Sequence, residues 1–105
     1  MLSGIEGDVQ LEEKPRQEDG KTIIITQQPV MECSLDILTE LVRHKTVTLR
    51  ARGESIPVAV AVANVVTENM LKGNSKILDI VVDSEDQGTN GPLVSVIEIT
   101  IRKTN

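Results

Sequence analysis

The chain has 105 residues, of which 39% are hydrophobic and 26% are charged, as expected for one small globular domain. Its 16 acidic residues outnumber its 11 Lys and Arg, and the formal net charge of −5 argues, at face value, against a polyanionic partner. The absence of Phe, Tyr and Trp excludes single-strand binding by base stacking on aromatic side chains.

The acidic residues are concentrated at the N-terminus. Residues 1–20 carry a charge of −4, which leaves −1 for residues 21–105. The first segment is also poor in apolar residues, so it cannot bury enough surface to offset the entropy of ordering. We therefore predict a disordered acidic tail over residues 1–20 and a folded domain over residues 21–105. The tail is either a solvated leader or an internal mimic of a polyanion.

The first half of the domain predicts a strand, a helix and a second strand. Residues 21–26 are a β-branched run that is too short for a helix. After Pro29, apolar residues recur at steps of three and four and predict an amphipathic helix to residue 43. The positive charges of residues 43–45 suit the negative end of that helix, so we predict no functional role for them. Residues 46–50 alternate polar with apolar, as a half-buried strand does.

Residues 56–71 predict a second helix. The alternation of Val and Ala over residues 58–63 is also compatible with a strand, but sixteen residues exceed the usual length of one. Ser55 is placed to cap the helix, and Gly73 follows its end.

Residues 77–83 and 93–102 are β-rich runs separated by turn residues, which predicts an antiparallel hairpin with a long tip. The element order is then β-α-β-α-β-β. With right-handed crossovers, both helices lie on one face of a four-stranded mixed sheet. The predicted fold class is α+β, a two-layer sandwich.

Reactive side chains have no evident partners. Cys33 is the only cysteine and His44 the only histidine, so neither a disulfide nor a cysteine-based zinc site is available within the chain. Asp83, Glu85 and Asp86 lack the spacing of a calcium loop. We expect no enzyme, no metal and no cofactor. No apolar run or signal-peptide pattern points to a membrane, and we expect a cytoplasmic protein.

Three segments together resemble the signatures of the Alba family. They are QPVM at residues 28–31, RARG at residues 50–53 and VSVIEI at residues 94–99, in the family's order and spacing. Alba proteins are small, chromatin-associated nucleic-acid-binding proteins of archaea and some eukaryotes. The resemblance covers about residues 21–103 and implies a fold similar to the C-terminal domain of translation initiation factor 3. It also implies a homodimer that binds duplex DNA or RNA with little sequence preference.

The resemblance points to five residues as the nucleic-acid-binding site: Gln27, Gln28, Arg50, Arg52 and Gly53. The family usually has two lysines where the glutamines stand, so this contact is uncharged here. From the residues alone, other interpretations stay open. The glutamines are also suitable turn residues, both arginines suit a solvent-facing strand end, and a glycine here serves the turn first.

The charge pattern predicts reduced affinity for DNA. The family's second loop commonly reads Arg-Gly-Arg, but here Glu54 follows Gly53. The family's hairpin tip usually carries arginines, whereas residues 84–93 contain acidic residues and no Lys or Arg. The remaining cations near the expected surface are Arg50, Arg52, Lys21 and Lys103. These cations still allow salt-sensitive binding, but fewer neutralised phosphates make that binding weak.

Two other functions remain open. The chain is also suited to be an acidic paralogue that forms a heterodimer with a more basic family member, because surplus acid selects a basic partner. It is suited as well to RNA binding within a ribonucleoprotein, where shape and 2′-hydroxyl contacts matter more than cationic hairpin tips.

Overall fold

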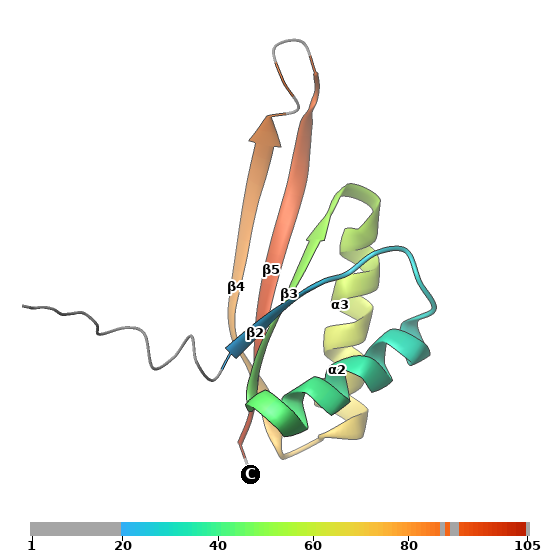
Figure 1. Ribbon diagram of the computed structural model, residues 1–105, viewed down its shortest axis with the longest axis vertical. Coiled ribbons are helices and arrows are strands. Elements are labelled where there is room, and N and C mark those ends of the chain that lie inside the picture. The colour runs from blue at the N-terminus through green and yellow to red at the C-terminus, as the bar shows by residue number, and fades with distance from the viewer. Residues whose placement is uncertain (1–19, 87, 89–90, 105) are drawn as a thin grey trace, which may run out of the picture.

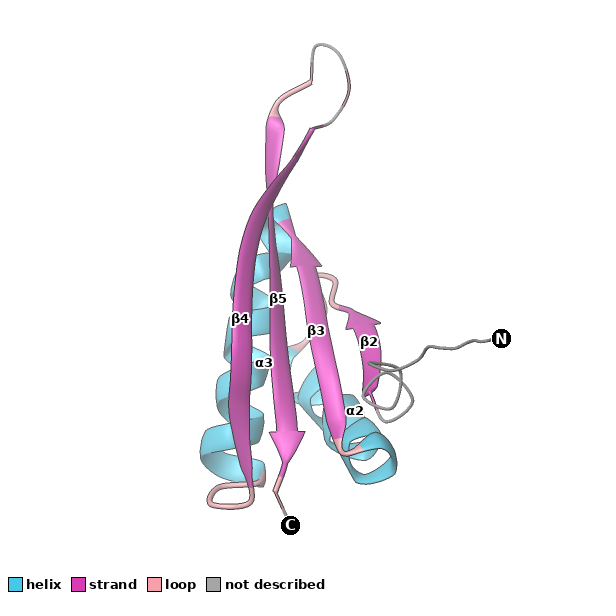
Figure 2. Cartoon of the chain, turned by 90° about the vertical axis from the view of Figure 1, so that its left-hand side faces the viewer, coloured by secondary structure: helices cyan, strands magenta, loops and turns pink. Residues whose placement is uncertain are grey.

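The computed structural model describes residues 20–86, 88 and 91–104 (Figures 1 and 2). Its elements are β2 (Gly20–Ile24), α2 (Val30–His44), β3 (Thr46–Arg52), a 3₁₀ turn (Gly53–Ser55), α3 (Ile56–Val65), a π-helical turn (Val66–Met70), β4 (Ser75–Asp86) and β5 (Leu93–Lys103). The predicted α+β fold with its β-α-β-α-β-β order is confirmed. The predicted tail lies outside the described residues, apart from Gly20, which begins β2.

The four strands form one mixed sheet in the order β2-β3-β5-β4. Strands β2 and β3 are parallel, and β5 pairs antiparallel with both β3 and β4. Both helices lie on the same side of the sheet (Figure 2). The sheet therefore has a helix-covered face and a second face, which we call the open face.

Aliphatic side chains form most of the core. Ile37 and Leu41 of α2 and Val62 of α3 pack on alternate residues of the two central strands, and all three have no exposed surface. Cys33 of α2 is buried in the same cluster. Burial raises the pKa of its thiol, and the charge of Asp36 adds to that rise. A neutral, buried thiol is a packing residue here.

The segment predicted as one helix over residues 56–71 divides into two parts. The α-helix ends at Val65, and the amide of Leu71 then donates to the carbonyl of Val66 at 2.8 Å, which closes a π-helical turn. The Thr67 hydroxyl donates to the carbonyl of Ala63 at 2.8 Å. The predicted Ser55 cap is wrong. Ser55 has helical φ and ψ and its side chain makes no capping hydrogen bond, because the 3₁₀ turn already leads into α3.

Gly53 makes the bend from β3 into the 3₁₀ turn, with a left-handed φ of 53°. An added Cβ would lie 3.7 Å from a methyl carbon of Val94, which is an ordinary contact. Gly53→Ala is therefore expected to meet no steric clash but to strain the backbone at this left-handed φ, which lowers the free energy of unfolding, measured in urea, by about 1 kcal/mol. Gly73→Ala, with φ 80° and open space around its Cβ, is the matched control and should lose a similar amount. An unchanged stability would contradict this assignment.

Candidate nucleic-acid interface

Two loops meet at the end of the sheet where the parallel strands β2 and β3 finish. In the β2–α2 loop, the Gln27 amide nitrogen donates to Glu54 Oε1 of the β3–α3 turn at 2.9 Å. The Gln28 amide oxygen accepts from the Thr26 hydroxyl at 3.1 Å. The structure thus brings the predicted glutamines close to the turn that contains Gly53. One donor of Gln27 is occupied by Glu54, and the Gln28 oxygen is occupied by Thr26.

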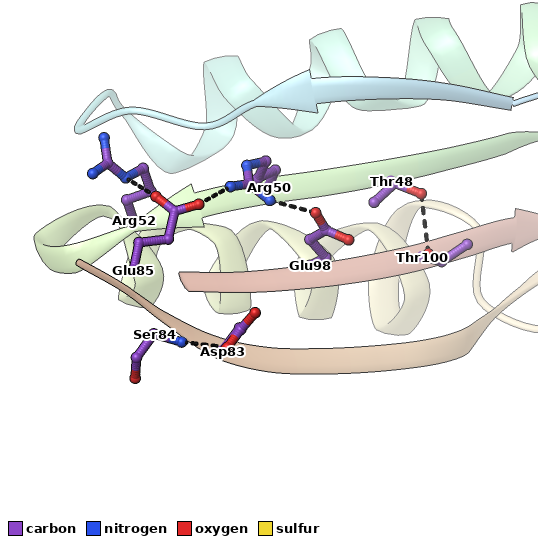
Figure 3. Close-up of polar contacts among 8 residues, drawn as sticks. All are labelled: Thr48, Arg50, Arg52, Asp83, Ser84, Glu85, Glu98 and Thr100. Carbon is purple, nitrogen blue, oxygen red and sulfur yellow. Dashed lines mark hydrogen bonds and ion pairs between the residues drawn. The ribbon is translucent and has the colours of Figure 1, made fainter. Parts of the chain in front are cut away.

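The predicted arginines lie on the open face of the sheet. Leu49 and Ala51 are buried under the helices, so Arg50 and Arg52, which alternate with them along β3, are on the opposite side. The register sets Arg50 opposite Glu98 of β5. A third strand, β4, contributes Glu85 to the same region (Figure 3).

Two glutamates hold both arginines. Arg50 Nη1 lies 2.5 Å from Glu98 Oε2, and its Nη2 lies 2.5 Å from Glu85 Oε2. The other oxygen of Glu85 lies 3.2 Å from Arg52 Nε, so one carboxylate bridges the two guanidinium groups (Figure 3). The hydrogen bond to Glu98 raises the pKa of Arg50, against the opposing effect of desolvation, and the charge of Glu85 raises it further. We call these four residues the arginine clamp.

The clamp covers a small apolar floor. Val96 is only 2% exposed although it sits opposite Arg52 on the open face. It lines a hollow together with Arg50 and Glu85, and long charged side chains bury their apolar stems against such surfaces. Glu54, which accepts from Gln27, adds a third glutamate to this end of the sheet. A phosphate that approaches the paired nitrogens of Arg50 must displace a carboxylate, whereas Arg52 is held, among the described residues, only through Nε.

Other cations do not lie where the sequence predicted them. Lys21, expected near the binding surface, extends to the helix side, where its Nζ lies 3.6 Å from Glu40 Oε1. Glu98 was not predictable as a partner of Arg50, because only strand register brings them together. A cluster of cations at the opposite end of the sheet was not predicted either. That cluster has no local sequence signal, because its members come from the end of α2, the start of β4 and the end of β5.

Comparison with protein families matches residues 21–84 to Alba. Among solved structures, Alba from Thermoplasma volcanium is 32% identical with a TM-score of 0.66, over 78% of this chain and 99% of that one. ALBA1 from Trypanosoma brucei is 21% identical with a TM-score of 0.63, over 80% of this chain and 69% of that one, which shows a shared fold. Comparison with curated protein sequences gives no match. Within the described residues, no helix is long and apolar enough to span a bilayer.

The family match covers the candidate interface. The matched range runs from β2 into β4 and includes the two loops and both arginines. Alba proteins are nucleic-acid binders without enzymatic activity, which agrees with the expectation that this protein is not an enzyme. This chain belongs to the Alba family.

Proposed function

We propose that this protein binds the backbone of duplex DNA or RNA without sequence preference, as a dimer, with lower affinity for DNA than a basic family member would have. Family membership supports the ligand class. The arginine clamp is the observation that carries the reduced affinity, because Arg50 gives both Nη groups to carboxylates and Arg52 shares the charge of Glu85 through Nε. Such a protein would act at the chromosome or in a ribonucleoprotein.

The end of the sheet that carries the β2–α2 loop and the β3–α3 turn, which we call the loop end, offers a few contacts to a phosphate backbone rather than a strong positive field. The Arg52 side chain is 49% exposed and has one partner within the described residues, so it is the more available of the two arginines. The amides of Gln27 and Gln28 contribute neutral donors, and Gly53 lets the backbone approach closely. Neutral donors position a phosphate but release no counterion, so they add little salt-dependent affinity.

Strand β4 supports the dimer. Ile80 and Val82 pair with the core residues Ile99 and Ile97, so they are on the helix side, yet they are 53% and 70% exposed. On the open face, Val81 is 47% exposed. A twelve-residue edge strand with apolar side chains on both faces is a surface that soluble monomers avoid. A second copy related by a two-fold axis would cover it.

The proposal is tested with fluorescently labelled duplex DNA and RNA, with the anisotropy of the label followed over a range of salt. We expect weak binding that falls steeply with salt, and an approximately threefold loss of affinity in the variant R50Q/R52Q, because clamped arginines contribute only part of a contact each. The variant K14Q/R16Q removes the same net charge from residues 1–20 and is the control. Absence of binding at about 50 mM salt would contradict the proposal.

The surplus of acid at the loop end supports a second candidate function. Three glutamates against two arginines suit a subunit that pairs with a more basic family member and contributes geometry rather than charge. This candidate predicts binding only when a basic Alba protein is mixed with this one. Binding by this protein alone would argue against it.

A further inference from the structure

The positive charge of the folded domain is gathered at one end. Seven of the nine Lys and Arg in residues 21–105 lie where β2 and β3 begin, α2 ends, β4 begins and β5 ends, near the C-terminus in Figure 1. These seven are Lys21, Arg43, Lys45, Lys72, Lys76, Arg102 and Lys103. The arginine clamp and the acidic residues of the hairpin occupy the other end. The net charge of −5 conceals this separation.

Four of the seven cations border one hollow. Lys45, Lys76, Arg102 and Lys103 line a shallow depression of about 280 Å³, and we call this the basic end. The backbone there is fixed, because the amide of Lys103 donates to the carbonyl of Lys45 at 2.8 Å. Lys45 itself has a left-handed φ of 69° after the last turn of α2. Three separate elements thus converge on the depression.

Two of these cations repel each other across the sheet. Lys76 and Arg102 are directly opposite each other across β4 and β5, and like charges in that position destabilise a sheet. Among residues 20–86, 88 and 91–104, no carboxylate lies within ion-pair distance of Lys45, Lys76 or Arg102. The next acid along β4, Asp79, uses one oxygen to accept from the amide of Ile80. An anionic ligand would relieve this repulsion.

The acidic residues of the clamp are too distant to cancel this charge. Glu98 is four residues along β5 from Arg102, which is roughly 13 Å in an extended strand. The Debye length at physiological ionic strength is about 8 Å. The basic end therefore keeps a positive local potential in a protein that is acidic as a whole.

We propose that the basic end binds the phosphate groups of a nucleic-acid backbone and supplies more of the electrostatic affinity than the arginine clamp does. The inference rests on the proposed function for the identity of the polyanion. Four cations along an open depression suit successive phosphates better than one small anion. Arg102 provides a planar fork for a phosphate, and the lysines provide point charges.

The test compares two variants that lose the same charge at opposite ends of the sheet. K76Q/R102Q is expected to bind labelled duplex at least tenfold more weakly than the wild type at about 50 mM salt, with a log-log salt slope smaller by about 2 for each protomer that contacts the duplex. R50Q/R52Q is expected to lose only about threefold. If the wild type binds and K76Q/R102Q binds equally well, the inference is overturned and the proposed function stands. If the wild type binds nothing, both are overturned.

Two thermal-unfolding measurements complete the test. Removal of the like-charge pair is expected to leave Tm unchanged or to raise it, so lost binding in K76Q/R102Q cannot be attributed to unfolding. Duplex is expected to raise the Tm of the wild type more than that of the variant. Inorganic phosphate at about 10 mM should give little shift. A shift as large as that from duplex would mean a single-anion site and would overturn the backbone inference.

Discussion

Replacing Glu85 and Glu98 together with glutamine is expected to strengthen binding to duplex nucleic acid by roughly a hundredfold at low salt. The two carboxylates occupy three of the donors on Arg50 and Arg52 at 2.5–3.2 Å. A glutamine keeps the size of each side chain and a hydrogen-bonding oxygen, but it removes the charge that competes with phosphate. The variant E85Q/E98Q should therefore gain about 2 in its log-log salt slope.

The control for this experiment is E32Q/D36N on the exposed side of α2, which removes the same net charge away from the arginines. Labelled duplex DNA and the anisotropy readout serve for all variants. Equal strengthening by both pairs of substitutions would mean that the overall charge of the protein, and not the clamp, limits affinity. Stability should change little, because partly exposed ion pairs of this kind contribute about 0–1 kcal/mol each.

The fold was largely predictable because its signals are local. Alternation within residues 46–50 and the β-rich run over residues 93–102 predicted two strands, and the apolar spacing after Pro29 predicted α2 to within one residue. The π-helical turn was not predictable from the same spacing. It is closed by the hydrogen bond of the Leu71 amide to the Val66 carbonyl, and the Thr67 hydroxyl beside it donates to the carbonyl of Ala63.

The candidate site was predictable as a set of positions but not as a set of contacts. The family resemblance named Arg50, and β3 does place it on the open face with Arg52. Its partners are 35 and 48 residues away in the sequence. Their pairing depends on strand register, and a slip of one residue would move Glu98 to the other face of the sheet. Lys45 was likewise interpreted from the sequence as a charge that suits the negative end of the α2 dipole, which is an effect within one element. Its proximity to Lys76 and Arg102 exists only in the folded sheet.

Val82→Glu is expected to convert the protein from a dimer to a monomer. Val82 is 70% exposed on the helix side of β4, where the helices leave the strand uncovered. In the proposed dimer it would be buried by the second copy, and an unpaired carboxylate there costs several kcal/mol. We expect the dimer dissociation constant to rise by at least about a hundredfold, as measured by sedimentation or light scattering.

Val42→Glu on α2 is the matched control, since Val42 is 64% exposed and lies on a different element. A dimeric Val82→Glu variant, or a dimer broken equally by Val42→Glu, would contradict the assignment of β4 to the interface.

The Val82→Glu variant also connects assembly to binding. A dimer presents two basic ends to one duplex, so its monomeric variant should bind with about half the log-log salt slope of the wild type. Loss of the dimer without any change in that slope would mean that one protomer alone contacts the nucleic acid.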